Sequence, residues 1–157
     1  MATIDSDKGL VEAVTALGAF CKGNKLIKLK DDGNPVTQYG SSVYYCGRDG
    51  KRYVFLSVKI YATWYVDFSN VYVITAQEMA ALPLGGNVTY RPGARLVKIQ
   101  SDPKTYTVSR NGLLRHVPDE ATAIALFGTS WSGLVDDIDV AFFLNYRIGQ
   151  PLAPIAP

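Results

Sequence analysis

Short runs of apolar and aromatic residues, separated by turn-forming residues, recur in both halves of the chain. Runs of this length and composition are typical of paired β-strands. They are "NKLIKLK" (24–30), "SVYYC" (42–46) and "KRYVF" (51–55) in the first half, and "KTYTV" (104–108) and "LLRHV" (113–117) in the second. Asp49-Gly50 and Asn111-Gly112 lie between such runs, and both pairs suit a type I′ hairpin, whose central residues need positive φ. The pattern predicts a three-stranded antiparallel meander in each half.

The hydrophobic period changes after the last strand of each meander. Apolar residues of "SVKIYATWY" (57–65) fall on one helical face, and "PDEATAIALFG" (118–128) opens with a proline and two acids that suit a helix start. A second short helix is predicted from Thr75, for which Glu78 completes a capping box, and its counterpart begins at Asp139. Each half is therefore predicted to have the order β-β-β-α-α.

The two halves also match each other in sequence. "GNKLIK" (23–28) matches "GARLVK" (93–98) at an offset of 93 − 23 = 70. "RDGKRYV" (48–54) matches "RNGLLRHV" (110–117), with offsets from 110 − 48 = 62 to 117 − 54 = 63. Two later pairs keep the same order, Phe68-Ser69 with Trp131-Ser132 and Leu84-Gly85 with Ile148-Gly149. Such self-similarity is typical of repeat proteins. The sequence thus predicts an α+β fold of two tandem β-β-β-α-α repeats.

The repeat sets the expected organisation of the chain. Leu10, Val14 and Leu17 have helical spacing ahead of the first copy, as expected of a terminal cap in an array. The segment "PLGGNVTYRPG" (83–93) is interpreted as the linker between copies. We divide the chain into an N-terminal capping helix (1–22), repeat unit 1 (23–86), repeat unit 2 (87–150) and a Pro-rich tail (151–157).

The composition indicates a folded chain and no charge-driven partner. Of 157 residues, 48% are hydrophobic and 19% charged, so burial can offset the ordering entropy. A net charge of +2 is too small to indicate a nucleic acid or an anionic membrane as partner. No stretch approaches the roughly 18 apolar residues that cross a bilayer, so no membrane span is predicted.

The two cysteines, Cys21 and Cys46, leave two interpretations open. They could be two buried thiols, which behave as small apolar groups. They flank strand-like segments that would pair through the intervening loop, so their Cα atoms could also come within the reach of a disulfide. We expect the disulfide if the protein is extracellular.

Few residues could carry catalysis or hold a metal ion. His116 is the single histidine, and it is interpreted as an imidazole packed among aromatic side chains of a sheet rather than as a catalytic base. Asp136, Asp137 and Asp139 offer the oxygen ligands that calcium prefers, but the EF-hand spacing is absent and acids also suit a helix start. We therefore expect no enzyme activity, catalytic residue, metal ion or cofactor.

Aromatic residues are the remaining candidates for a binding surface. Ten tyrosines, two tryptophans and six phenylalanines exceed what such short elements can bury. Exposed tyrosine and tryptophan suit either stacking on sugar rings or a protein interface. The candidate ligand-binding residues are Tyr61, Trp64, Tyr65 and Trp131.

Several longer phrases carry a resemblance to a known type of repeat. They are "DGKRYVF" (49–55), "TWY" (63–65), "DFS" (67–69), "GGNVTYRPGARLVKI" (85–99), "DPKTY" (102–106) and "LRHV" (114–117). From about residue 23 to 150 the chain resembles a tandem repeat module of predicted secreted and cell-envelope proteins of candidate-phylum bacteria. The resemblance implies a location outside the cytoplasm and a non-enzymatic role.

Together these features predict a non-catalytic structural or interaction module, extracellular or at the cell surface. Its expected partner is another protein or further copies of itself, with which it would self-associate. The alternative is a carbohydrate or cell-wall binding module that uses exposed tryptophan and tyrosine, with cell-wall polysaccharide as partner. A hydrolase is disfavoured because the chain offers a single histidine as base.

Overall fold

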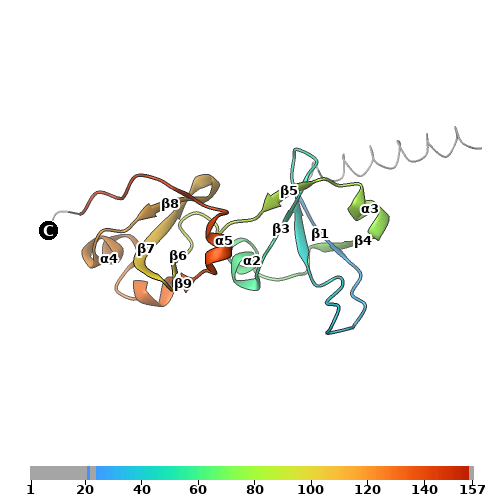
Figure 1. The fold of residues 1–157 in the computed structure, drawn as a ribbon, viewed down its shortest axis with the longest axis horizontal. Helices are drawn as coiled ribbons and strands as arrows, with labels where there is room; N and C mark the ends of the chain where they lie inside the picture. Colours follow the sequence, from blue (N-terminus) through green and yellow to red (C-terminus); the bar gives the residue numbers. More distant parts are fainter. Residues whose placement is uncertain (1–20, 22–23, 156–157) are drawn as a thin grey trace, which may run out of the picture. The chain divides into compact units, whose positions relative to one another are not determined.

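The computed structural model describes Cys21 and residues 24–155, which form two compact units (Figure 1). The first unit comprises the described residues up to Val58 together with Tyr65–Val88. The second comprises Lys59–Trp64 and the chain from Thr89 onward. The predicted capping helix (1–22) lies outside the described residues, apart from Cys21.

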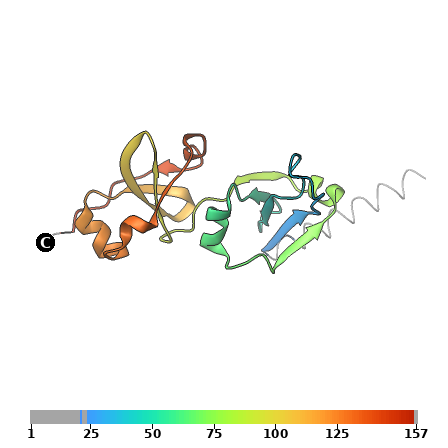
Figure 2. The ribbon, with the colours of Figure 1, turned by 90° about the horizontal axis from the view of Figure 1, so that it is seen from below.

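The first unit is built on a five-stranded mixed sheet of order β4-β1-β2-β3-β5. Its strands are β1 (Lys25–Leu29), β2 (Val43–Cys46), β3 (Arg52–Val54), β4 (Val71–Ile74) and β5 (Leu84–Asn87). β1, β2 and β3 pair antiparallel, whereas β4 and β5 pair parallel to β1 and β3 at the two edges. Figure 2 shows β1, in blue, beside β4.

The second unit contains a five-stranded mixed sheet of order β10-β8-β7-β6-β9. Its strands are β6 (Leu96–Ile99), β7 (Asp102–Ser109), β8 (Leu113–His116), β9 (Val135–Asp137) and β10 (Arg147–Ile148). β6, β7 and β8 pair antiparallel, and the edge strands β9 and β10 pair parallel to β6 and β8.

Four short α-helices connect the strands of the described chain. They are α2 (Val58–Trp64), α3 (Ala76–Ala80), α4 (Glu120–Phe127) and α5 (Val140–Phe143), and two 3₁₀ turns lie at Arg110–Gly112 and Trp131–Leu134. The capping box predicted at α3 is confirmed, because Thr75 accepts from the Glu78 backbone and Glu78 bonds back to the Thr75 N–H. Asp119 and Asp139 cap α4 and α5 through their side chains.

The predicted fold of two three-stranded antiparallel meanders with two helices each is wrong. Each unit has a mixed sheet of five strands, because a strand follows each helix and returns parallel to an outer strand of the meander. These strands have only two to four residues, too short for a period of two to be recognised. β5 falls inside the segment interpreted as a linker (83–93). It contains two glycines, which are disfavoured in strands, so the sequence pattern did not predict it.

The two sheets share the same strand order and the same sense at every pairing. The hydrogen bonds that follow the strands also correspond. Phe55 donates its N–H to the Val43 carbonyl at 3.1 Å, and Val117 donates to the Thr105 carbonyl at 2.9 Å. Both pairs are separated by the same offset, since 117 − 55 = 62 and 105 − 43 = 62. Strand register therefore relates the two units residue by residue.

Each unit has its own core. In the first, Ile27 packs with the two cysteines against α3 and the segment that follows it. In the second, Leu96 packs with Val117 and with Ala123 of α4. Leu152 also packs on this second core, and its N–H donates to the His116 carbonyl at 3.0 Å. The first residues of the Pro-rich tail thus contribute to the second unit.

The two predicted hairpin corners adopt different turns. Asn111 and Gly112 both have positive φ, 58° and 67°, as a type I′ turn requires. At the other corner Gly50 has φ of 76°, but Asp49 is not among the described residues with positive φ, so the type I′ prediction is wrong there. A hydrogen bond of 3.0 Å from the Gly50 N–H to the Gly47 carbonyl closes this turn, and Gly50 is its one residue with positive φ.

Candidate functional site

A buried carboxylate lies at the edge of the second sheet. Asp136 of β9 is only 6% exposed, and it faces Arg95, which immediately precedes β6. Arg95 donates from Nε to Oδ2 at 2.7 Å and from Nη2 to Oδ1 at 3.0 Å, a bidentate arrangement. The same Nη2 donates to the Gly133 carbonyl at 3.2 Å. The charge of Asp136 is thereby compensated by a guanidinium held in a fixed orientation.

Two buried tyrosines complete this network. The Tyr90 hydroxyl donates to Asp136 Oδ2 at 3.0 Å, and the Tyr90 N–H donates to the Tyr146 hydroxyl at 3.1 Å. Burial, and then the hydrogen bond to Asp136, raises the pKa of Tyr90 well above its ordinary value. Burial also raises the pKa of Tyr146. Both phenols therefore stay protonated and act as hydrogen-bond donors or acceptors at neutral pH.

A cavity of about 430 Å³ opens beside Asp136. Its lining residues are Lys59, Ala62, Thr63, Ala94, Arg95 and Asp136. Three of them come from α2, which is anchored to the second unit by two hydrogen bonds. The Arg91 N–H donates to Thr63 Oγ1 at 3.0 Å, and Trp64 Nε1 donates to the Thr89 carbonyl at 2.9 Å. The cavity thus combines two cationic side chains, one compensated carboxylate and small apolar walls.

The first unit has a different pair at the corresponding positions. Leu26 pairs with Val71 in the first sheet, and Leu96 pairs with Val135 at the equivalent position of the second sheet. Lys25 therefore corresponds to Arg95, and Tyr72 corresponds to Asp136. The Lys25 ammonium lies 5.1 Å from the centre of the Tyr72 ring, a cation–π contact. The first unit thus has a cation–π contact at the position where the second unit has an ion pair.

Exposed apolar side chains gather at the β4 edge of the first unit. Tyr72 and Val73 of β4 are 47% and 60% exposed, and Val66 and Phe68 shortly before β4 are also exposed. We name these four residues the apolar edge. The corresponding strand β9 carries Asp136 and Asp137 instead, and Asp137 pairs with Lys98 at 2.5 Å. The edge strand β4 of the first sheet therefore carries uncharged residues where the equivalent strand β9 of the second sheet carries two aspartates.

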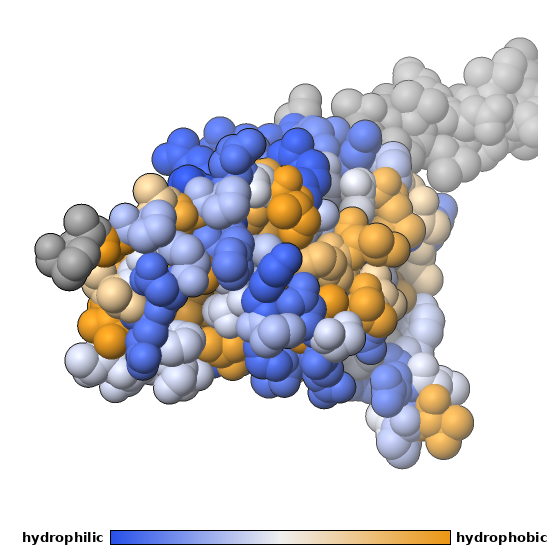
Figure 3. All heavy atoms as spheres, turned by 60° about the vertical axis from the view of Figure 1, so that its left-hand side comes forward, coloured by the Kyte–Doolittle hydropathy of each residue, from blue (hydrophilic) through white to orange (hydrophobic). Residues whose placement is uncertain are grey.

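The second unit also exposes apolar side chains, on elements other than β9. Val140, Phe142 and Leu144 are exposed on and after α5, and Ile148 is exposed on β10. Figure 3 shows hydrophobic side chains in separate patches, with hydrophilic residues between them.

The four aromatic residues proposed from the sequence have different environments. Trp64 is 39% exposed, with its indole N–H held by the Thr89 carbonyl. Tyr61 is only 3% exposed, so its ring contributes to packing. Trp131 is partly buried against the second core, and Tyr65 is half-buried with its ring edge against Phe55. Trp64 thus presents the largest aromatic surface of the four.

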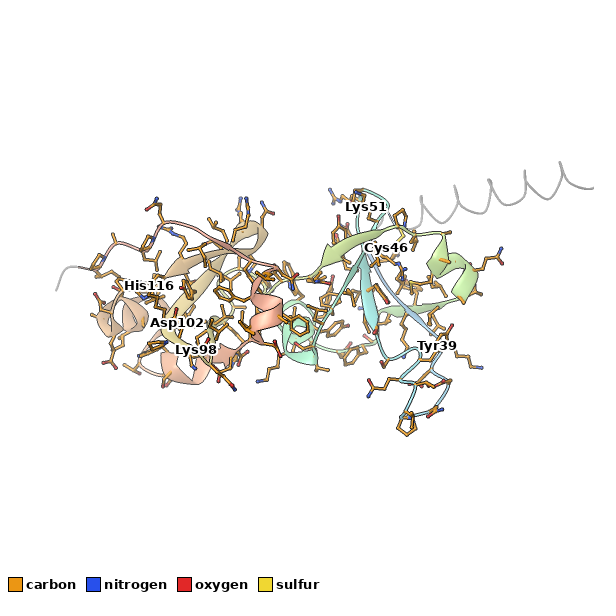
Figure 4. All side chains as sticks on the ribbon, in the orientation of Figure 1. Tyr39, Cys46, Lys51, Lys98, Asp102 and His116 are labelled. Carbon is orange, nitrogen blue, oxygen red and sulfur yellow. A yellow bond between two sulfur atoms is a disulfide. The ribbon has the colours of Figure 1, made fainter. Side chains whose placement is uncertain are left out.

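The other residues considered for chemistry have structural partners. His116 packs edge-on against Tyr106, with ring centres 5.8 Å apart (Figure 4). Register places His116 opposite Tyr106, as Val54 lies opposite Tyr44, so His116 corresponds to Val54. The offset of 63 read from the sequence would instead match His116 with Tyr53, which is wrong by one residue. Of the three aspartates considered for calcium, one faces Arg95, one pairs with Lys98 and Asp139 caps α5. Across Cys21 and residues 24–155, no three or more His, Cys, Asp or Glu side chains form a group that could hold a metal ion.

The two cysteines form a disulfide. Cys21 and Cys46 are fully buried, with Cα atoms 4.9 Å apart. The bond ties Cys21, four residues before the start of β1 at Lys25, to the end of β2 (Figure 4 labels Cys46). The enclosed segment includes the loop 30–42, which projects from the first sheet and carries Tyr39 (Figures 1 and 4). The disulfide expected for an extracellular location is therefore present.

The part of the chain that the structure describes has no helix long and apolar enough to cross a membrane. No protein-family model, curated protein or solved structure matches the chain.

Proposed function

We propose that this protein is a non-catalytic interaction module that works outside the cytoplasm and associates with other copies of itself. The buried disulfide supports the location, because disulfides persist mainly in oxidising compartments. The matching topology of the two sheets supports the interpretation of the chain as an internal duplication. The resemblance to repeat modules of secreted and cell-envelope proteins agrees with both.

The observation that carries the proposal is the apolar edge of the first unit. β4 forms the outer strand of its sheet, and it contains no charged residue or proline. Proteins usually protect such edges with charges, bulges or covering segments. β9 follows this practice with two aspartates at the equivalent positions, whereas β4 exposes Tyr72 and Val73. The difference between the two edges favours β4 as the strand that accepts a partner.

A second copy of the chain suits this edge. Two identical β4 strands, related by a two-fold axis, can pair antiparallel and extend both sheets at once. Such pairing would place apolar side chains of one copy beside those of the other, which stabilises cross-strand neighbours. Because the same surface is used on both copies, the assembly would close as a dimer.

The test measures mass against concentration by light scattering after size exclusion, without any ligand. We expect the native chain to shift from monomer to dimer as concentration rises. Val73→Lys should remove the dimer, because it places a charged side chain on each β4 strand of the new pair. Val36→Lys is the matched control, since Val36 is exposed in the projecting loop of the same unit. A native chain that stays monomeric, or equal behaviour of both variants, would refute the proposal.

The carbohydrate-binding alternative depends on Trp64. Its ring is partly exposed, and the hydrogen bond to Thr89 fixes its orientation, as stacking on a sugar requires. Binding to peptidoglycan or to a glycan array that is lost in Trp64→Ala, with an unchanged fold and no ligand-free assembly, would favour this alternative. Trp131→Ala is less informative because Trp131 belongs to the second core.

A further inference from the structure

We infer that the cavity beside Asp136 in the second unit binds a small carboxylate. This inference concerns a surface separate from the apolar edge and does not depend on self-association. The ligand would lie between Lys59 of α2 and Arg95 at the start of β6, the two cationic residues that line the cavity.

The charge of the cavity favours an anion. Lys59 and Arg95 contribute two positive charges, and Asp136 contributes one negative charge, so the lining carries one net positive charge. Asp136 does not compete strongly with the ligand for the remaining donors of the cavity. Both of its oxygens already accept hydrogen bonds from Arg95, and one also accepts from Tyr90. A carboxylate would supply the missing negative charge.

Arg95 is preorganised to receive it. Its Nε and Nη2 are committed to Asp136 and the Gly133 carbonyl, which fixes the plane of the guanidinium. Nη1 makes no hydrogen bond within the part of the chain that the structure describes, so its two donors remain for a ligand. A planar guanidinium with fixed donors loses little freedom when it binds a carboxylate.

Lys59 is the second cationic residue of the cavity that could contact the ligand. Its side chain is 69% exposed, and Nζ lies 4.0 Å from Asp136 Oδ1, beyond hydrogen-bond distance. Because the ammonium is exposed and makes no hydrogen bond to Asp136, it can turn to a ligand at small cost. Lys59 would therefore add attraction for the anion without giving up a strong contact.

The remaining walls set the size of the ligand. Ala62 and Ala94 have short side chains, and the space of about 430 Å³ is ample for a molecule of several heavy atoms. Thr63 already donates to the Ile60 carbonyl at 2.7 Å and accepts from the Arg91 N–H, so it is not the main donor to the ligand. A small mono- or dicarboxylate fits these walls and this charge.

The first unit has different residues at the corresponding positions. Lys25 corresponds to Arg95 and lies over the ring of Tyr72, which stands where the second unit has Asp136. Only the second unit should therefore respond to the ligand, which provides an internal control within one molecule.

The experiment is a titration of the uniformly ¹⁵N-labelled full chain with acetate and with succinate, at ionic strength held constant with sodium chloride. The Val73→Lys background keeps self-association from interfering. We expect saturable shifts of the amide signals of Lys59–Thr63 and Ala94–Arg95, with those of Lys25 and Tyr72 unchanged. Lys59→Gln should weaken binding by about fivefold, the upper range for one exposed charge pair.

Lys104→Gln is the matched control, because Lys104 is an exposed lysine of the same unit outside the cavity. It should leave the affinity unchanged. The amide spectra of both variants report directly whether each remains folded. The inference is overturned if no saturable shift occurs at the cavity, or if the two lysine variants weaken binding equally. Neither result would bear on the dimer expected from the apolar edge.

Discussion

Arg95 and Asp136 join the start of β6 to the neighbouring edge strand β9 through two hydrogen bonds of 2.7 and 3.0 Å. Replacing Arg95 by Met should cost about 3 kcal/mol of unfolding free energy, because it leaves a buried carboxylate without its cation. Asp136→Asn keeps a polar side chain of the same shape and should cost less. Urea denaturation of both variants measures the difference.

A double-variant cycle separates the pair from its surroundings. Arg95→Met combined with Asp136→Leu should recover part of the lost stability, since no buried charge then remains. Full additivity of the two single effects would contradict a direct coupling between these side chains.

Tyr90 provides a pH-dependent prediction at the same network. Burial raises its pKa in the folded protein, so the neutral phenol stabilises the fold fully below the pKa of an unfolded tyrosine, about 10. This contribution is lost as the pH rises further through the folded pKa. Thermal unfolding measured from about pH 8 to about pH 11, a range that spans the pKa of an unfolded tyrosine, should therefore show stability falling at the alkaline end. Tyr90→Phe should reduce that fall.

The same variant has an effect at neutral pH. Tyr90→Phe removes one donor from Asp136 and should lower stability by about 1 to 2 kcal/mol at pH 7. Tyr146→Phe leaves Asp136 untouched and serves as the comparison, although it removes the acceptor for the Tyr90 N–H. An unchanged alkaline slope in Tyr90→Phe would assign the pH dependence to other groups.

Sequence patterns predicted the central strands and the helix starts because these elements have local signals. Thr75 and Glu78 specify their helix through a capping box, which needs only four consecutive residues. The edge strands β5 and β10 have no such signal, since they form only because a neighbouring strand provides hydrogen-bond partners. The fold class was therefore wrong at the edges of the sheets.

The candidate site was harder to predict than the fold. Tyr90, Arg95 and Asp136 come together through the parallel pairing of β6 with β9, which the sequence pattern did not reveal. The sequence indicated Asp136 only as one of three neighbouring acids, because the cation that pairs with it, Arg95, lies 41 residues earlier in the chain. A run such as "LVDDIDV" (134–140), with apolar residues flanking the acids, was the one local hint of a strand there.

The disulfide should contribute measurably to stability. It closes a segment with a sequence separation of 25 residues, and loops of that size are expected to contribute about 3 kcal/mol through the unfolded state. Replacing Cys21 and Cys46 together by alanine should lower the melting temperature, and reductant should destabilise the native chain but not this variant. Mass spectrometry should show a gain of two hydrogen atoms on reduction, whereas two freely alkylated thiols in the native protein would contradict the bond.

Gly85 provides a test of the close contact between β5 and β3. A Cβ added at Gly85 would lie 2.6 Å from Cε1 and 2.8 Å from the hydroxyl of Tyr53, too close for ordinary contact. Tyr53 cannot move away without cost, because its hydroxyl donates to Asp49. Gly85→Ala should therefore destabilise the protein by about 1 to 2 kcal/mol. Gly133→Ala is the control, since a Cβ there meets open space. Chemical denaturation measures both changes.

The Tyr53 ring can then be removed to identify the cause. In a Tyr53→Ala background the added methyl group has no ring to displace, so Gly85→Ala should cost much less than in the native chain. If its cost were unchanged, the loss would come from the backbone of β5 rather than from the ring. In the second unit, a Cβ added at Gly149 would lie 2.9 Å from Cγ and 3.0 Å from Cδ1 and Cδ2 of Leu113. Gly149→Ala should therefore show a smaller version of the same effect, because a leucine side chain adjusts more easily than a tyrosine ring held by a hydrogen bond.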